Sequence, residues 1–406
     1  MNYGLMEPIY ITGMGMNCSL GWTPEEIHTS LIADAKGGIS NIEILNTRHR
    51  GTFPVGEIKR ETEDLRAEIT NQGGYQLNRT SILATKAVEQ AIEQARHAHR
   101  AGGRLGLISG TTVGGMDVTE DGYINHVEGR LHNINFFQLG GAAFCAEYLA
   151  ERLGGVQYLS TISTACSSSL NAIGNAVQLL QAGQLDIAIA GGADALCRFT
   201  INGFNSFRLL DQNRCRPFDA TRSGINLGEG AAYFVLETET SLRRTGNKPI
   251  AMITGYGNHN DRFHPSSISP DGVGIQMAMR SALEQSKTPL DKVDYILTHG
   301  TATPNNDASE GAAIHNLFSE VAVPDYVSLK SSFGHTLAAS GAINTGVGIT
   351  SILNGTKYPN YNWTEAMPEL SSGPLATTLE KQSVNNVIIN ATGMGGYCSS
   401  MVLSKT

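Results

Sequence analysis

The sequence has few charged residues, no long basic run and no long apolar run. Charged side chains make up 16% of its 406 residues, and the formal net charge is -8. Nucleic-acid binders neutralise phosphates with clustered Lys and Arg, so this composition argues against a nucleic-acid partner. No stretch approaches the about 20 apolar residues of a membrane span, and the first residues lack signal-peptide character. We therefore expect a cytoplasmic protein without membrane insertion.

Paired cysteine motifs are also missing. The sequence has six cysteines, and none of them forms a Cys-x-x-Cys pair. This scatter argues against a zinc site and against a disulfide framework. We expect no bound metal, and we expect five of the six to be small buried apolar residues. The six are Cys18, Cys145, Cys166, Cys197, Cys215 and Cys398.

Glycine, in contrast, is abundant, with 46 residues against the roughly 28 that an average content of ~7% would give. Many glycines follow short apolar runs, where the backbone must turn tightly or approach a ligand closely. These runs alternate with segments of helical spacing, for example 81–95 and 276–285. Such alternation predicts an α/β protein with mixed or parallel sheets covered on both faces. The apolar runs are 9–11, 105–108, 185–190, 231–236, 250–253, 293–297 and 387–390.

Two halves of the chain repeat one theme. The first begins Ile11-Thr12-Gly13-Met14-Gly15, and the middle of the chain restarts with Ile253-Thr254-Gly255-Tyr256-Gly257. Each half later has a loop with a chemically special residue, followed by an apolar helix-like segment. We predict duplicated α/β halves, 1–245 and 246–406, joined around 243–247.

Cys166 lies in the segment Thr164-Ala165-Cys166-Ser167-Ser168, just before an apolar segment that ends at Ala182-Gly183. The small polar residues suit the first turn of a helix, and the residues after them suit a buried helix face. We therefore expect the thiol at a helix N-terminus, where unpaired N–H groups and the helix dipole favour the thiolate. The alternative is a buried structural cysteine.

His299 and His335 lie in loops of small residues, and His299 directly follows an apolar strand-like run. Side chains in such loops project into clefts. His97, His99 and His315 lie in helical segments and fit ordinary packed histidines. Lys330, five residues before His335, fits a site residue better than a solvated surface charge. The pattern indicates a thiol nucleophile with two imidazoles.

Seven motifs, taken together and in order, resemble those of the β-ketoacyl-[acyl carrier protein] synthases of the thiolase superfamily, and they cover nearly the whole chain. The motifs are Ile11-Thr12-Gly13-Met14-Gly15, Thr164-Ala165-Cys166-Ser167-Ser168, Arg216-Pro217-Phe218-Asp219, Leu227-Gly228-Glu229-Gly230-Ala231, His299-Gly300-Thr301-Ala302-Thr303-Pro304, Lys330-Ser331-Ser332-Phe333-Gly334-His335 and Gly393-Met394-Gly395-Gly396. The resemblance implies a five-layered α/β/α/β/α fold, and a homodimer or a heterodimer with a related subunit.

The resemblance also implies roles for the site residues. Cys166 would accept an acyl group from a carrier-protein thioester, and malonyl-carrier protein would lose carbon dioxide to give the attacking carbanion. His299 and His335 would donate hydrogen bonds to the malonyl thioester oxygen, and the main-chain N–H groups of Cys166 and Met394 would hold the acyl oxyanion. Lys330 would hold His335 and tune the local field.

Further residues are assigned to substrate binding by the same resemblance. Thr301 and Thr303 would contact the phosphopantetheine arm, which the acyl carrier protein brings with it, so no separate cofactor is expected. Val113, Phe204 and Met394 would shape the acyl pocket, although the first two also fit plain core residues. The carrier protein is acidic and would dock on local basic residues despite the negative total charge. The candidates are Arg66, Arg79 and Arg208.

Two positions depart from the family pattern. Asn344 stands where many relatives have a Glu, which leaves the charge balance around Lys330 open. Met394 stands where a Phe gates the cysteine in common relatives, and Thr392 replaces a second Phe. Because Met is flexible and unbranched, we expect a differently shaped acyl entrance.

Two other functions remain open at this point. A degradative thiolase would use coenzyme A and a second cysteine in the last glycine loop, but Cys398 comes after Gly395-Gly396. A chain-length-determining partner subunit usually lacks the nucleophile, and here Cys166 is present. The sequence leaves the pathway open between fatty-acid synthesis and type II polyketide, polyene or pigment synthesis.

Overall fold

The computed structural model describes residues 7–33, 37–70, 72, 75–130, 139–265 and 267–406, and its strands form one sheet. The order across this sheet is β3-β2-β4-β5-β1-β6-β10-β9-β7-β8. The strands are β1 (Ile9–Cys18), β2 (Leu105–Gly110), β3 (Val156–Ile162), β4 (Ile187–Asp194), β5 (Gly230–Glu237), β6 (Ala251–Asn260), β7 (Tyr295–Leu297), β8 (Asp325–Val327), β9 (Asn386–Gly393) and β10 (Tyr397–Ser404). Every predicted apolar run contributes to one of these strands.

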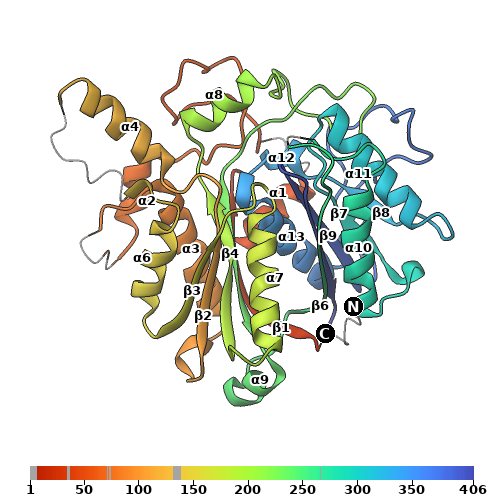
Figure 1. The fold of residues 1–406 in the computed structure, drawn as a ribbon, viewed down its shortest axis with the longest axis horizontal. Helices are drawn as coiled ribbons and strands as arrows, with labels where there is room; N and C mark the ends of the chain where they lie inside the picture. The colour runs from red at the N-terminus through yellow and green to blue at the C-terminus, as the bar shows by residue number, and fades with distance from the viewer. Residues whose placement is uncertain (1–6, 34–36, 71, 73–74, 131–138, 266) are drawn as a thin grey trace.

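Helices cover the sheet where helical spacing was predicted (Figure 1). The α-helices are α1 (Pro24–Ile32), α2 (Thr62–Ala67), α3 (Arg79–Gln94), α4 (Met116–Val127), α6 (Phe144–Leu153), α7 (Ser168–Gln181), α8 (Arg198–Ser206), α9 (Glu239–Thr245), α10 (Val273–Ser286), α11 (Pro304–Leu317), α12 (Lys330–Phe333) and α13 (Ser340–Asn354). Short 3-10 turns occupy Ala98–Arg100, Leu290–Lys292 and Leu337–Ala339. None of the described helices combines the length and the apolar character that crossing a membrane requires. The cytoplasmic location stays a prediction.

Local sequence sets where several of these helices begin and end. Asn78 caps α3 by accepting a hydrogen bond from the Ser81 N–H at 2.8 Å, the usual role of a residue before the first helical turn. At the C-terminal end of α13, Gly355 has φ of +62°, a conformation that glycine adopts without strain. This glycine therefore ends α13 at Asn354. The apolar segment after Cys166, predicted to end at Ala182-Gly183, forms α7 and ends at Gln181.

The strand order shows the duplication directly. The first half has the order β3-β2-β4-β5-β1, and the second half, read from its own edge, has β8-β7-β9-β10-β6. Corresponding strands occupy corresponding places, and the two halves meet where Ile9–Ile11 pairs with Ala251–Ile253. The prediction of an α/β fold from two duplicated halves is confirmed. The boundary at 245/246 stays a prediction, although it falls between α9 and β6.

Alternating side chains build five layers. On β5, Tyr233 and Val235 pack with α3 and α6 on one face, whereas Phe234 packs with α7 and α13 on the other. On β9, Ile389 faces this same central helix pair and Ile388 packs with α10 and α11. The order is therefore outer helices, sheet, α7 with α13, sheet, outer helices, which Figure 1 shows from left to right. This arrangement follows from the two-residue period of strands.

The carboxyl ends of the parallel strands position the chemistry. β2, β3 and β4 run parallel in the first half, and β7, β8 and β9 do so in the second. Cys166 follows β3, His299 follows β7, and Lys330 follows β8. Ligands of α/β proteins bind at such strand ends. The two halves thus present their loops to one shared region.

Candidate active site

Cys166 lies in the loop between β3 and α7 and is 8% exposed. The preceding Ala165 has φ of +51°, a conformation that costs a non-glycine residue energy unless its surroundings hold it. Hydrogen bonds supply that support, because Ser168 accepts from the Thr164 N–H at 2.9 Å and Ser167 donates to the Thr164 carbonyl at 2.8 Å. The sulfur is therefore held at a sharp turn just before the first residue of α7, close to the predicted helix start.

The environment of Cys166 favours the protonated thiol over the thiolate. Burial raises the pKa of Cys166 to about 12, while the positive charge of Lys330 lowers it and the charge of Asp194 raises it. Loss of water around the sulfur outweighs the nearby cation. This raised pKa is opposite to the expectation that the helix terminus favours the thiolate, so the proton must leave Sγ as the sulfur attacks.

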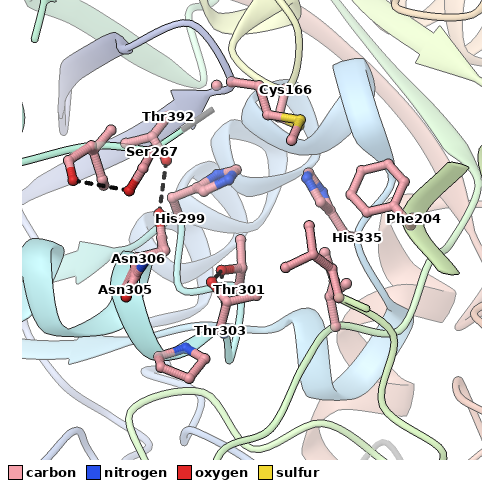
Figure 2. Close-up of a pocket in the computed structure, with 16 residues that line it drawn as sticks. Cys166, Phe204, Ser267, His299, Thr301, Thr303, Asn305, Asn306, His335 and Thr392 are labelled. Atoms are coloured by element: carbon pink, nitrogen blue, oxygen red, sulfur yellow. Dashed lines mark hydrogen bonds between the residues drawn. The ribbon is translucent and has the colours of Figure 1, made fainter. Parts of the chain in front are cut away.

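His299 and His335 face each other beside this sulfur (Figure 2). Their ring centroids are 5.1 Å apart, and the ring planes meet at 84°. The Sγ of Cys166 and one ring nitrogen of each histidine all lie within 4.8 Å of one another. The structure thus brings together the three side chains that the sequence singled out.

Both imidazoles are neutral in this environment. Burial, Lys330 and His335 hold the pKa of His299 well below its usual 6.5, and burial with Lys330 does the same for the pKa of His335. A neutral imidazole carries one N–H donor. Each ring can therefore offer one hydrogen bond to an oxygen in the space between them and Cys166.

The carboxylate of Glu310 orients the His299 loop. Glu310, on α11, accepts hydrogen bonds from the main-chain N–H groups of His299 at 2.9 Å and Gly300 at 2.7 Å. The side chain is fully buried, and burial raises its pKa. Sequence reasoning missed this residue. The sequence feature that could have indicated it is a carboxylate in the helix that directly follows the histidine motif.

Lys330 hydrogen-bonds to His299, and within the part of the chain that the structure describes Nδ1 of His335 has no hydrogen-bond partner. The ammonium group of Lys330 donates to the main-chain carbonyl of His299 and lies 3.5 Å from the Nδ1 atom of the same residue. The prediction that Lys330 holds His335 is corrected: the main-chain N–H of His335 donates instead to the carbonyl of Asn226 at 2.7 Å. Burial lowers the pKa of Lys330 to about 8, and the charge of Glu310 opposes this shift.

Asn344 does not supply a charge to this network. Its amide donates to the Thr298 carbonyl at 3.1 Å, next to His299. Among the charges that raise the pKa of Lys330, that of Glu310 has the largest effect. The negative charge that balances Lys330 therefore comes from α11, and Asn344 has a main-chain contact in place of an ion pair.

Asp194 is a second carboxylate that sequence reasoning missed. It ends β4 and is fully buried. It accepts hydrogen bonds from the hydroxyl of Thr111 at 2.6 Å and from the main-chain N–H groups of Val113 at 3.2 Å and Ala338 at 2.8 Å. Because Ala338 belongs to the second half, Asp194 ties the two halves together behind the site. An acidic residue at the end of an otherwise apolar strand was the available signal.

A cavity of about 280 Å³ opens over Cys166 and the two histidines. Thr301 and Thr303 line it, with their hydroxyl oxygens 2.7 Å apart. Phe204 and Met394 line it as well. Val113 is not among the lining residues and belongs to a buried cluster against which Phe204 packs, so its assignment to the acyl pocket stays a prediction. The remaining lining residues are Leu209, Ile225, Ser267, Ile268, Pro304, Asn305, Asn306, Thr392 and Gly393.

The Met394 loop rests directly on the cysteine loop. A methyl group added at Gly393 would lie 2.8 Å from the Thr164 carbonyl oxygen and 3.3 Å from the Cys166 nitrogen. Glycine is therefore required here for the close approach of two backbones. The main chain that leads to the Met394 N–H thus lies beside the Cys166 N–H, as a shared oxyanion site would need.

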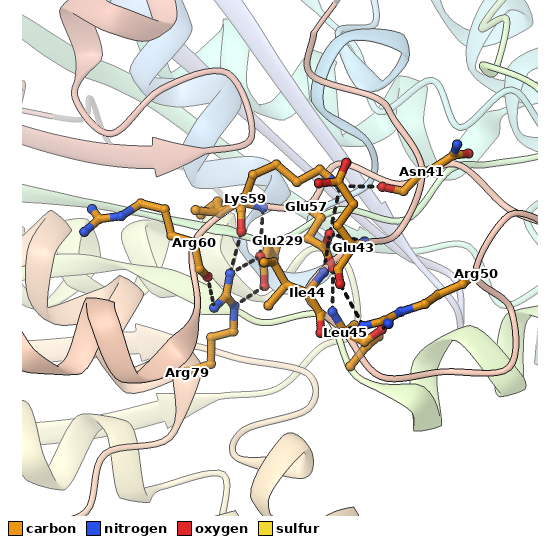
Figure 3. Close-up of polar contacts among 11 residues, drawn as sticks. Asn41, Glu43, Ile44, Leu45, Arg50, Glu57, Lys59, Arg60, Arg79 and Glu229 are labelled. Atoms are coloured by element: carbon orange, nitrogen blue, oxygen red, sulfur yellow. Dashed lines mark hydrogen bonds and ion pairs between the residues drawn. The ribbon is translucent and has the colours of Figure 1, made fainter.

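The three candidate docking arginines have different surroundings. Arg79 is 5% exposed and pairs with Glu229 through two hydrogen bonds of 2.7 and 2.9 Å (Figure 3). Its assignment to a docking surface is therefore wrong. Arg66 turns inward to the Leu77 carbonyl and pairs with Glu63. Arg208 is exposed, and its neighbour Leu209 lines the cavity.

Comparisons with known proteins agree with this geometry. The N-terminal domain of β-ketoacyl synthases matches residues 6–241, and the C-terminal domain of the same family matches residues 250–364. Nodulation protein E of Rhizobium meliloti is 31% identical over 96% of each chain, and 3-oxoacyl-[acyl-carrier-protein] synthase 2 of Staphylococcus aureus is 28% identical over 98% of each chain. The solved ishigamide ketosynthase/chain length factor aligns with a TM-score of 0.91 and 27% identity, covering 99% of this chain and 100% of the other. The chain belongs to the β-ketoacyl synthase family and is a condensing enzyme of the acyltransferase class.

Proposed function

We propose that this enzyme condenses an acyl group held on Cys166 with the carbanion formed by decarboxylation of malonyl-acyl carrier protein. The observation that carries the proposal is the grouping of one thiol and two neutral imidazoles within 4.8 Å at the floor of the cavity. A thiol can hold an acyl group as a thioester, and two N–H donors can stabilise an enolate oxygen.

The first step transfers the acyl group. Sγ of Cys166 attacks the carbonyl of the acyl thioester, and the main-chain N–H groups of Cys166 and Met394 bind the oxyanion. The bond to the phosphopantetheine sulfur breaks, and the proton of the Cys166 thiol goes to that departing thiolate. The raised pKa of Cys166 fits proton transfer that accompanies attack.

The second step forms the new carbon–carbon bond. The malonyl carboxylate leaves as carbon dioxide, and the electrons of the broken bond delocalise onto the thioester oxygen. His299 and His335 each donate one N–H bond to that oxygen, and each donor is worth about 3–4 kcal/mol in comparable sites. The carbanion attacks the acyl carbonyl, the bond to Sγ breaks, and the released thiolate takes a proton from solvent.

The carrier protein would deliver both substrates through the cavity mouth. The Thr301 and Thr303 hydroxyls line the cavity and can hydrogen-bond to the amides of a phosphopantetheine arm. Arg208 is exposed, its neighbour Leu209 lines the cavity, and its guanidinium group can pair with an acidic surface. We propose docking at this surface and not at Arg79 or Arg66.

A second subunit fits the open edge of the sheet. β3 is a terminal strand of the sheet, and its Leu159 is exposed. Tyr123 and Val127 on α4 and Phe199 on α8 are exposed apolar side chains. Exposed edges and apolar patches are typical of interaction sites. We propose a homodimer, or a heterodimer with a related subunit, since the ishigamide relative is a ketosynthase/chain length factor.

The thiolase alternative has little support. Cys398, the second cysteine that this reaction would need, lies in β10, is 1% exposed and does not line the cavity. The non-catalytic partner alternative is disfavoured by the grouping of Cys166 with both histidines. The pathway, whether fatty-acid or type II polyketide, polyene or pigment synthesis, depends on the acyl group that the enzyme accepts.

The test combines acyl- and malonyl-carrier proteins of varied acyl length with mass analysis of Cys166. We expect an acyl adduct on Cys166 in the wild type and none in Cys166→Ala. We expect His299→Ala and His335→Ala to keep the adduct and to lose condensation by about 10²–10³-fold, since each removes one donor to the enolate oxygen. Unchanged product formation in the histidine variants would contradict these roles.

A further inference from the structure

The side-chain amide of Asn171 links the two halves of the molecule beneath Cys166. Asn171 lies on α7 and is 7% exposed. Its Nδ2 atom donates to the hydroxyl of Thr164 at 2.8 Å and to that of Ser167 at 3.4 Å. These two residues flank the Ala165-Cys166 turn. The amide nitrogen therefore holds both ends of the cysteine loop.

The oxygen of the same amide is bound entirely by the second half. Oδ1 accepts from the hydroxyl of Tyr256 at 2.8 Å, from Nδ2 of Asn258 at 2.9 Å, and from the hydroxyl of Ser399. Tyr256 and Asn258 lie on β6, and Ser399 lies on β10, the strand that follows the Met394 loop. Every hydrogen-bonding position of this amide oxygen is thus used to reach the other half.

Space around Tyr256 is arranged for this contact. A methyl group added at Gly174, one turn along α7, would lie 2.2 Å from the Tyr256 ring. Glycine at this position lets the ring approach the helix and bring its hydroxyl to Asn171. The tie between the halves is therefore made by side-chain shape as well as by hydrogen bonds.

We propose that Asn171 is a positioning residue that sets Cys166 in register with the catalytic groups of the second half. The thiol comes from the first half, whereas His299, His335 and Met394 come from the second. Their relative placement depends on how the cysteine loop sits against β6 and β10. A misplacement of about 1 Å between reacting groups can cost about 10²-fold in rate, so a tie at this point has a direct effect on turnover.

The strained turn adds a second reason. Ala165 has φ of +51°, and such conformations persist only where neighbouring contacts hold them. Asn171 and Gly393 act on the same residue, Thr164, from two directions. Loss of the Asn171 amide lets the cysteine loop relax away from the histidines while leaving the thiol, the imidazoles and the cavity residues in the chain. This inference rests on the proposed condensation for its kinetic consequence.

The test uses Asn171→Ala, the double variant Tyr256→Phe with Ser399→Ala, and Asn175→Ala as the matched control. Asn175 lies one turn further along α7, and within the described residues its Oδ1 has no hydrogen-bond partner. We expect kcat for condensation to fall about 10–100-fold in the first two variants, with KM for the acyl carrier within about twofold of the wild type. We expect alkylation of Cys166 by iodoacetamide, which needs neither imidazole, to change far less.

Three kinetic results would each overturn the inference. They are equal losses in Asn175→Ala and Asn171→Ala, full turnover in both Asn171→Ala and the double variant, or parallel losses in kcat and in the rate of alkylation. The double variant keeps the test valid if Asn171→Ala fails to fold. A crystal structure of either variant gives a readout independent of turnover. The inference fails if the thiol and ring nitrogens keep their wild-type grouping, whereas a wild type that never forms acyl-Cys166 counts against the proposed function alone.

Discussion

Lys330 donates a hydrogen bond from a fully buried ammonium group to the main-chain carbonyl of His299. The same cation lowers the pKa values of His299, His335 and Cys166. A positive charge at this point therefore favours neutral imidazoles and opposes the burial penalty on the thiolate. One residue acts on all three members of the site without belonging to the cavity lining.

Lys330→Met should reduce condensation by about 10–100-fold, the usual cost of losing a residue that orients a catalytic ligand. Methionine has a side chain of similar length but no ammonium group. The variant therefore loses both the hydrogen bond to the His299 carbonyl and the positive charge. Formation of acyl-Cys166, measured by mass, should fall less than condensation does. Equal losses in both steps would show that Lys330 acts mainly on the thiol.

The titration of Lys330 predicts a pH effect of defined sign. Burial lowers its pKa from 10.5 to about 8, so condensation should decline as pH rises through about 8 and the cation is lost. In the same range the unfolded chain binds more protons than the folded one, so this group makes stability rise between about pH 8 and 10.5. Denaturant unfolding of wild type and Lys330→Met across this range checks the sign, since only the wild type should show the rise.

Gly393→Ala should lower acyl transfer to Cys166 by about 10²-fold. The new methyl group would lie 2.8 Å from the Thr164 carbonyl, so the Met394 loop must move away from the Cys166 N–H. Gly37→Ala is the control, because nothing lies within 4 Å of a methyl group added there. Single-turnover acylation followed by mass spectrometry measures the effect, and wild-type acylation in Gly393→Ala would argue against a shared oxyanion site.

Arg79→Ala should destabilise the fold by about 3–5 kcal/mol, since it leaves the carboxylate of Glu229 buried without its partner. Arg208→Ala should change the free energy of unfolding by less than about 0.5 kcal/mol, because the side chain is exposed. Its effect should be a higher KM for the acyl carrier at low salt. Denaturant unfolding and salt-dependent kinetics separate the two roles, and a stable Arg79→Ala with a raised KM would reverse our assignment.

The strand ends of this fold could be predicted from sequence because apolar runs, glycines and the special residues follow one another in a fixed local order. Cys166 and His299 were found in this way. The partner of Lys330 could not, because it depends on how two strands lie side by side. β7 pairs with β8 in parallel so that Leu297 faces Val327, which places the residues beyond them, His299 and Lys330, next to each other.

Burial of charged side chains was harder still to foresee. Arg79 begins α3 and has polar neighbours in sequence, which is typical of an exposed residue. Its buried position becomes evident only from its hydrogen bonds to Glu229, which is distant in sequence. Asp194 and Glu310 were missed for the same reason, since their hydrogen-bond donors come from other segments of the chain. Local pattern identifies a strand end or a helix, whereas the use of a carboxylate depends on tertiary contacts.

The equal strand orders of the two halves have a consequence for how this enzyme can vary. One copy supplies the sulfur and the other supplies the imidazoles. Neither copy can therefore accumulate substitutions without an effect on catalysis. A hybrid assembled from halves of two relatives would retain every reacting group. It would still be inactive unless the contacting surfaces of the two halves were complementary.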